Sequence, residues 1–239
     1  AEERLGKTDL DSGLDYGTIA ISKYRKSDGT NSWLVTIPGT DGKHDSPFGW
    51  PQNVELMSSD SKQRMEADSA RMVQEAMKQA GIKSNEPVAL IGHSQGGIVA
   101  ATIASDLKDD YDIEHVVSAG SPVANHPIPE KTWVTSVEMD DELVAALDGA
   151  ANPSSDHWLT VRGTASKSSS NQESTFAGTP VTDAPDNKEI THWLKYHQAA
   201  YQNATDMGST AVNTHERHFD EIIDGDLQEV MYFEGRMSK

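Results

Sequence analysis

The stretch VALIGHSQGGIVAAT, residues 88–102, decides the fold of this chain. It begins with apolar residues, is interrupted by glycines on both sides of Ser94, and continues with small and apolar residues. The first part is typical of a buried β-strand and the last part of a helix that packs closely against it. Glycines two residues before and two residues after Ser94 permit a sharp turn, because Cβ atoms there would collide. The stretch therefore predicts a strand, a tight turn at Ser94 and a helix.

The segment from Gly92 to Gly96 also fits the pattern G-x-S-x-G. Between a buried strand and a helix, this pattern indicates a nucleophile elbow, in which a strained backbone lifts the serine hydroxyl clear of the sheet. The amino terminus of the helix then directs N–H groups towards the serine and stabilises developing negative charge. We interpret Ser94 as a nucleophile; a phosphate-binding turn and a plain tight turn are the alternatives.

Strand-like and helix-like segments alternate on both sides of this stretch. Near-continuous apolar strands in such an alternation are typical of a mainly parallel sheet with helices on both faces. We expect strands at 16–24, 32–38, 87–93, 113–120, 133–139 and 157–163, and helices at 62–80, 96–107, about 192–205 and 210–223. No repeat or domain boundary is evident, so residues 1–239 are predicted to form a single α/β domain.

Two polar stretches, 40–60 and 164–190, are predicted to be loops at the rim of that domain. The first contains Phe48 and Trp50, and residues 176–185 of the second precede the histidines discussed below. Both are candidates for a lid or for the wall of an apolar acyl pocket. The alternative is that their aromatic side chains only cap the sheet.

Composition excludes several classes of partner. The net charge of −18 argues against nucleic-acid binding, which needs basic patches, and makes an anionic membrane surface a poor partner. No apolar run reaches the roughly 18 residues of a membrane span. The chain has no cysteine, which excludes disulfides and cysteine-ligated metals. His215 and His218 share a predicted helix face, but no third ligand is evident, so we expect neither a metal nor a cofactor.

The start of the chain bears on where the protein is located. It begins with Ala rather than Met, and it shows no signal-peptide pattern. Together with its acidic, cysteine-free composition, this start slightly favours a trimmed secreted or cell-surface protein.

A nucleophilic serine needs a base, and the base needs an orienting acid. In proteins with a nucleophile elbow, the serine comes first in the chain, followed by the acid and then by the histidine. The predicted strand 133–139 runs into three adjacent acids, of which we prefer Asp141, with Glu142 second. For the base, His192 stands at the predicted start of a late helix and His197 lies farther inside it; we rank His192 slightly ahead of His197.

An oxyanion formed at Ser94 would need two N–H donors. The residue after the nucleophile, Gln95, supplies the first from the helix amino terminus. The second is expected in a loop after an earlier strand, where the segment IPGT places Thr40. A simple turn built from proline and glycine is compatible with this role.

From about Ser32 to about Thr205 the chain resembles α/β-hydrolases of the esterase and lipase type. The resemblance is most specific at GHSQGG, IPGT, SAGSPVA and the acid-rich turn. IPGT is similar to the oxyanion loop of fungal class 3 lipases, and GHSQGG is similar to the elbow of bacterial lipases. The resemblance implies an α/β-hydrolase fold and a triad of Ser94, Asp141 (or Glu142) and His192 (or His197).

Residues and resemblance together predict a metal-independent serine hydrolase that cleaves lipid or short-chain carboxylic esters through an acyl-enzyme. Two other classes remain open. An acyltransferase would use the same triad, and product analysis with an alcohol acceptor would separate it from a hydrolase. A binding protein without activity on the same fold is the other alternative.

Overall fold

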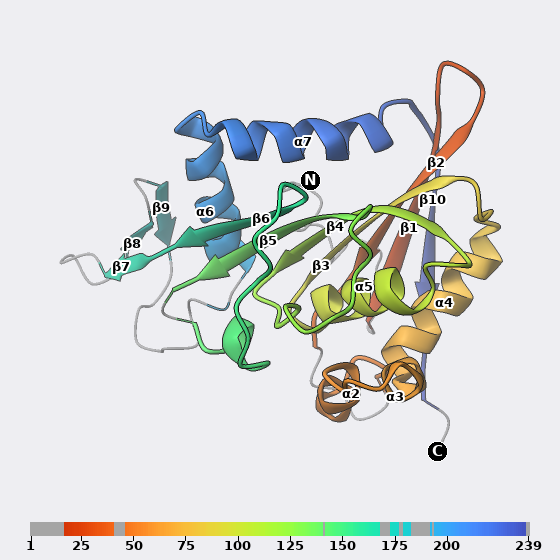
Figure 1. The fold of residues 1–239 in the computed structure, drawn as a ribbon, viewed down its shortest axis with the longest axis horizontal. Helices are drawn as coiled ribbons and strands as arrows, with labels where there is room; N and C mark the ends of the chain where they lie inside the picture. Colours follow the sequence, from red (N-terminus) through yellow and green to blue (C-terminus); the bar gives the residue numbers. More distant parts are fainter. Residues whose placement is uncertain are drawn as a thin grey trace.

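A seven-stranded sheet lies at the centre of the structure (Figure 1). The structure is a computed structural model that describes residues 17–40, 46–140, 142–167, 173–176, 179–182, 192 and 194–237. The sheet has the order β10-β1-β2-β3-β4-β5-β6. Its strands are β1 (Thr18–Arg25), β2 (Asn31–Ile37), β3 (Pro87–His93), β4 (Asp112–Ala119), β5 (Trp133–Met139), β6 (Trp158–Gly163) and β10 (Asp226–Glu234). Strands β2 to β6 run parallel, whereas β1 pairs antiparallel with β2 and with β10.

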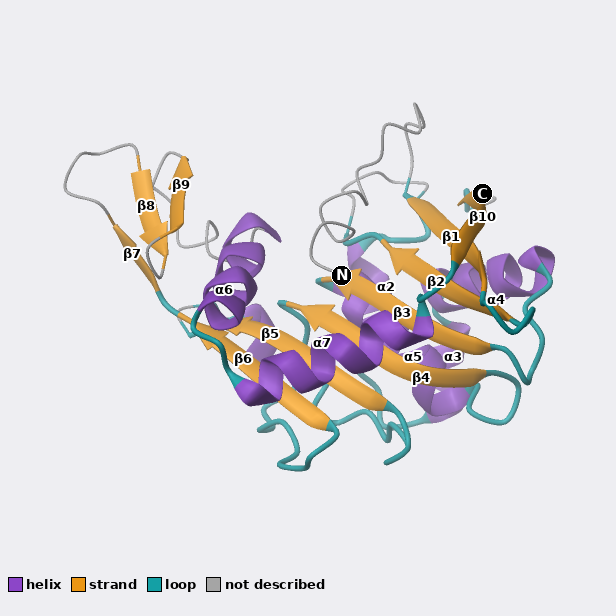
Figure 2. Ribbon diagram, turned by 90° about the horizontal axis from the view of Figure 1, so that it is seen from above, coloured by secondary structure: helices purple, strands orange, loops and turns teal. Residues whose placement is uncertain are grey.

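Helices cover both faces of this sheet (Figures 1 and 2). One face carries α2 (Trp50–Leu56), α3 (Ser61–Glu66), α4 (Asp68–Ala80) and α5 (Gln95–Asp106). The other face carries α6 (Leu194–Asp206) and α7 (Thr210–Ile222), and Figure 2 shows α7 crossing the strands. Within the part of the chain that the structure describes, no helix combines the length and apolar character needed to cross a bilayer.

The apolar run of β3 has a direct structural explanation. Side chains alternate across a strand, so Val88 and Leu90 enter the hydrophobic core beneath α4 and α5, whereas Ala89 and Ile91 enter the core beneath α6 and α7. All four are completely buried. The strand is therefore continuously apolar because helices cover both of its faces. This arrangement confirms the predicted α/β-hydrolase type of fold, with a mainly parallel sheet between two helical layers.

One predicted helix is divided in two. Residues 62–80 form α3 and α4, separated at Ala67, whose backbone is extended (φ −58°, ψ 129°). Asp60 caps α3 by accepting hydrogen bonds from Lys62 N and Gln63 N. Arg64 of α3 turns into the fold, where its Nε donates to Asp106 Oδ2 of α5 at 2.8 Å. The break therefore lets α3 dock on α5 while α4 continues along the sheet.

Both stretches predicted to be loops contain regular structure, so these two predictions were wrong in part. Helix α2 begins at Trp50, and Pro51 lies in its first turn, where the missing N–H costs nothing. The second stretch contains β7 (Ala165–Lys167), β8 (Glu173–Phe176) and β9 (Thr179–Thr182), which pair antiparallel in a separate small sheet. Polar threonine-containing segments can form strands when they pair with each other, even without an apolar face.

Leu90 provides a test of the double-sided core. We expect Leu90→Ala to lower the free energy of unfolding by about 2–5 kcal/mol, because it removes a fully buried side chain and leaves a cavity. Urea unfolding measures this change. The same substitution at Leu147, which is 61% exposed, is the matched control and should change stability by less than about 0.5 kcal/mol. Equal effects at the two positions would contradict the assigned core.

Candidate active site

The turn between β3 and α5 holds Ser94 in an unusual backbone conformation. Its φ is 54° and its ψ is −122°, and it is the one non-glycine residue with positive φ in the described part of the chain. Several bonds hold it there: Ser94 N–H donates to the Ala119 carbonyl at 2.8 Å, and the Ser94 carbonyl accepts from Ser121 Oγ at 2.8 Å and from Gly97 N–H at 3.0 Å. The turn is thus the strained strand-to-helix elbow expected from the sequence.

The glycines on either side of Ser94 are required by direct backbone contact. A Cβ atom on Gly92 would lie 2.2 Å from the carbonyl carbon of Gly96. A Cβ atom on Gly96 would lie 2.4 Å from the carbonyl oxygens of Ile37 and Pro38. The first contact is the one that the sequence pattern implied. The second shows that the elbow also packs against the end of β2.

Ser94, His192 and Glu142 form a continuous line of hydrogen bonds. His192 Nε2 lies 2.9 Å from Ser94 Oγ, and His192 Nδ1 bonds to Glu142 Oε1. The three residues come from different connections: Ser94 from the β3–α5 elbow, Glu142 from the turn after β5, and His192 from the residues just before α6. All three connections meet at the carboxyl edge of the parallel strands, where sites in such sheets are found.

The chemistry of these groups determines where the protons lie. An ionised carboxylate accepts hydrogen bonds only, so His192 Nδ1 must carry a proton. In neutral His192 the Nε2 atom is then an acceptor, and it faces the Ser94 hydroxyl. The arrangement therefore presents a base within hydrogen-bond distance of the serine proton.

The structure describes three of the four residues among which the sequence left a choice. Asp141, the preferred acid, lies outside the described residues, and Glu142, the second choice, carries the carboxylate that contacts His192. Of the two histidines, His192 contacts Ser94, and His197 lies on the far side of the acid, with its Nε2 2.8 Å from Glu142 Oε2. Each oxygen of Glu142 thus bonds to a different imidazole.

Glu142 is a buried carboxylate, with a side chain only 2% exposed. Burial by itself would raise its pKa, but the hydrogen bonds from His192 and His197 outweigh burial and lower the pKa from 4.5 to about 2. The carboxylate is therefore ionised throughout the neutral and mildly acidic range, as an acid that orients a histidine must be.

His93 makes a contact that sequence patterns did not indicate. Its Nε2 lies 2.7 Å from the His192 carbonyl oxygen, and since a carbonyl only accepts, His93 Nε2 is the donor. Burial, followed by the nearby His197, lowers the pKa of His93 to about 3, which keeps this ring neutral. His93, at the first variable position of G-x-S-x-G, therefore holds the backbone of His192, the histidine that faces Ser94.

The segments of the two predicted oxyanion donors reach the elbow. A Cβ atom on Gly39, the residue before Thr40, would lie 3.6 Å from Ser94 Cβ. Gln95 is the first residue of α5, and N–H groups in the first turn of a helix have no partner within the helix. The structure thus brings both predicted segments to Ser94.

Asn53 of α2 connects these two segments, a link that the sequence did not suggest. Gln95 Nε2 donates to Asn53 Oδ1 at 3.0 Å and to the Gly49 carbonyl at 2.8 Å. Asn53 Nδ2 in turn donates to Thr40 Oγ1 at 3.5 Å. Helix α2 is therefore joined by side chains to both residues that would carry the oxyanion donors.

The aromatic residues of the stretch 40–60 differ in their surroundings. Phe48 is completely buried in the core beneath α4 and α5, so it packs the fold rather than lining an open pocket. Trp50, at the start of α2, is 72% exposed. Of residues 176–185, the structure describes only 176 and 179–182. In the stretch 40–60, a role in acyl binding therefore stays a prediction for Trp50 but not for Phe48.

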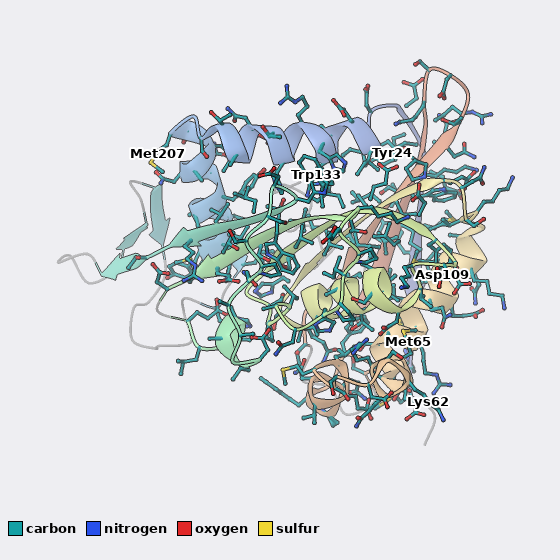
Figure 3. All side chains as sticks on the ribbon, viewed as in Figure 1. Tyr24, Lys62, Met65, Asp109, Trp133 and Met207 are labelled. Carbon is teal, nitrogen blue, oxygen red and sulfur yellow. The ribbon has the colours of Figure 1, made fainter. Side chains whose placement is uncertain are left out.

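Four histidines surround Trp133, which Figure 3 shows beneath α7. They are His115, His157, His215 and His218. Burial lowers the pKa of His115 well below 6.5, and its Nε2 lies 2.9 Å from Thr135 Oγ1. Nowhere among the described residues do three or more potential ligands form a group able to hold a metal ion. Stacked rings and hydrogen bonds of this cluster join α7 to the sheet.

Fold and site together define a class, the α/β proteins of hydrolase type. A model of the PGAP1-like alpha/beta domain family matches residues 53–176, just over half of the chain, and the protein belongs to this family. The matched segment contains Ser94 and Glu142, whereas Thr40 and His192 lie outside it. No curated protein was found to match the sequence.

The two hydrogen bonds of Glu142 predict a pH dependence of stability. The pKa of Glu142 is about 2 in the folded protein and 4.5 in the reference state, so the unfolded state binds more protons in this interval. The contribution of Glu142 to stability is present above pH 4.5 and is lost as the pH falls through about 2. The difference in the free energy of unfolding between wild type and Glu142→Gln should therefore shrink over this range.

Urea unfolding at a series of pH values measures that difference. Glu229→Gln, which removes an exposed glutamate of β10, is the matched control and should leave the pH profile of stability unchanged. A difference between wild type and Glu142→Gln that stays constant from neutral pH to pH 2 would contradict a strongly ionised Glu142.

Proposed function

We propose that the protein is a serine hydrolase of carboxylic esters, in which Ser94 is the nucleophile, His192 the base and Glu142 the orienting acid. One observation carries this proposal: the 2.9 Å contact between His192 Nε2 and Ser94 Oγ, with a buried carboxylate on the opposite nitrogen of the same ring. A strained serine, a base and an orienting acid in this order are the requirements for nucleophilic catalysis by serine. Membership of a hydrolase-type family supports it.

In the first step, Ser94 Oγ forms a bond to the acyl carbon of the ester, and the Ser94 proton moves to His192 Nε2. The electron pair of the carbonyl moves to its oxygen, which accepts hydrogen bonds from the N–H groups of Gln95 and Thr40. Glu142 stabilises the positively charged imidazole. These interactions become strongest as charge develops, so they lower the barrier rather than merely bind the ester.

In the second step, the bond between the acyl carbon and the alcohol oxygen breaks, and the alcohol leaves with the proton from His192. An acyl group then remains on Ser94. His192 takes a proton from water, the water oxygen attacks the acyl carbon, and the carboxylic acid departs as Ser94 regains its proton. The substrate class is a small-molecule or lipid ester, and no metal or cofactor takes part in any of these steps.

Ser94→Ala is expected to lower the hydrolysis of p-nitrophenyl esters by about 10⁴-fold or more, because the nucleophile is removed. A fluorophosphonate should add once to the wild-type protein, with the adduct mapped to Ser94 by mass spectrometry. Ser27→Ala, at an exposed serine in the turn between β1 and β2, is the matched control and should keep both activity and labelling.

Undiminished activity in a folded Ser94→Ala protein would refute the proposal. Products with an added alcohol acceptor separate two reactions of the same site: free acid indicates hydrolysis, and a new ester indicates acyl transfer. A folded wild-type protein that neither reacts with the fluorophosphonate nor cleaves any ester of the series would favour a binding protein on this fold.

Glu142 and Asp141 are adjacent, so a pair of matched substitutions assigns the acid. Glu142→Gln should lower kcat by about 10⁴-fold, since an amide cannot stabilise the charged imidazole or select the correct tautomer. Asp141→Asn should have a much smaller effect on kcat. Steady-state kinetics with a p-nitrophenyl ester measures both, and the opposite ranking would transfer the role to Asp141.

A further inference from the structure

We propose that His197 is a positioning residue, which holds the Glu142 carboxylate in the orientation that His192 requires. This inference rests on the proposed function, because it assigns to Glu142 the role of orienting acid. In the sequence, His197 was the alternative base. Its place in the structure, on the opposite side of the acid from His192, indicates a different task.

The contact itself is short and completely enclosed. His197 Nε2 lies 2.8 Å from Glu142 Oε2, and the exposed fractions of the two side chains are 0% and 2%. Because an ionised carboxylate only accepts, His197 Nε2 must carry the proton of this bond. A hydrogen bond to a charged acceptor in such surroundings is stronger than one in water.

A second donor is needed because of the shape of glutamate. The terminal torsion of a glutamate side chain is broad, so a carboxylate held by one oxygen can rotate. His192 holds Oε1 and His197 holds Oε2. With both oxygens occupied, rotation would break a buried charged hydrogen bond, and the lone pair of Oε1 stays directed at His192 Nδ1.

The backbone next to this contact leaves room for it. Gly120, which follows β4, has a φ of +59°, and a Cβ atom there would lie 2.8 Å from His197 Nε2 and 3.0 Å from Glu142 Oε1. Any side chain at this position would therefore push both partners apart. This glycine belongs to the segment SAGSPVA, whose role the sequence had left open.

Helix α6 couples the two histidines. His192 lies just before the helix begins at Leu194, and His197 lies within its first turns, completely buried. The bond from His197 to Glu142 thus anchors the start of the helix that follows His192. His93 Nε2 donates to the His192 carbonyl, so the base is positioned through its backbone and through its acid.

The test uses two kinds of substitution at one position. His197→Leu removes the donor and keeps a bulky apolar side chain, whereas His197→Gln restores an N–H group that can reach Oε2. We expect kcat for a p-nitrophenyl ester to fall by about 10- to 100-fold in His197→Leu, with KM nearly unchanged. Losses of this size are typical when a hydrogen-bond partner that orients a functional side chain is removed. His197→Gln should recover most of this loss.

A buried histidine elsewhere in the same helical layer provides the matched control. His215 of α7 bonds to Thr135 Oγ1 at 3.2 Å and to the Asp156 carbonyl. His215→Leu should lower the free energy of unfolding but leave kcat of the folded protein unchanged. If His197→Leu does not fold, His197→Asn serves in its place, because its shorter amide cannot reach Oε2 and should lower kcat in the same way.

A second measurement does not depend on catalysis. The proton on His192 Nδ1 should give a far-downfield NMR resonance in the Ser94→Ala protein, because it lies in a hydrogen bond to a buried, ionised carboxylate. We expect this resonance to persist in His197→Gln and His215→Leu and to be lost in His197→Leu or His197→Asn. Unchanged kcat and an unchanged resonance in a folded protein without the His197 donor would overturn the inference.

The two measurements separate this inference from the proposed function. If the wild-type protein cleaves esters but neither kcat nor the resonance responds to His197, the inference fails and the proposed function stands. If no ester is cleaved and no fluorophosphonate adduct forms, but the resonance responds as expected, the proposed function fails and the positioning of Glu142 by His197 stands.

Discussion

The contact between the backbones of Gly92 and Gly96 is the constraint on which the rest of the structure depends. It permits the chain to reverse within one residue, which forces Ser94 into a backbone conformation that other residue types rarely adopt. The same turn sets α5 directly against β2 and β4, since Gly96 meets the carbonyls that end β2 and a Cβ on Gly97 would lie 2.0 Å from Ser121 Oγ. The central helix therefore cannot shift without opening the elbow.

Near this turn, three histidines lie around the negative charge of Glu142. Glu142 lies in a buried position where a lone carboxylate would be unfavourable, and donors on both of its oxygens keep it ionised. His93 remains neutral because burial, followed by the nearby His197, lowers its pKa to about 3. The chain has a net charge of −18. Among the described residues of this cluster, however, Glu142 is the only acidic group, and it accepts hydrogen bonds from two of the histidines.

The parts of the fold with a strong local pattern were predictable. The apolar β3 and the glycines of the elbow follow from residues close in sequence, and the structure reproduces β3 with the predicted bounds. The helix α2, the small sheet of β7 to β9 and the edge strand β10 were missed. The sequences of α2 and of β7 to β9 are mostly polar, and β10 follows from its pairing with the distant β1 rather than from a local pattern.

The same distinction applies to the site. Ser94 could be identified because its geometry is local, whereas the choice among adjacent acids and nearby histidines depends on directions that only the tertiary structure defines. The contacts of His93 and Asn53 were missed for this reason as well. Gly120 was the available signal for the second histidine, since a glycine after a parallel strand often marks a close approach.

The hydrogen bonds that join Ser94, Glu142 and His192 have a consequence for folding. Ser94 and His192 are 98 residues apart in the chain, and Glu142 and His192 are 50 residues apart. Contacts of such long range form late, because closing long loops costs chain entropy before the contacts offset it. Collapsed intermediates that already contain the elbow would therefore lack the contacts of His192 with Ser94 and Glu142 and would be inactive. Recovery of function during refolding would then report completion of the native topology rather than formation of secondary structure.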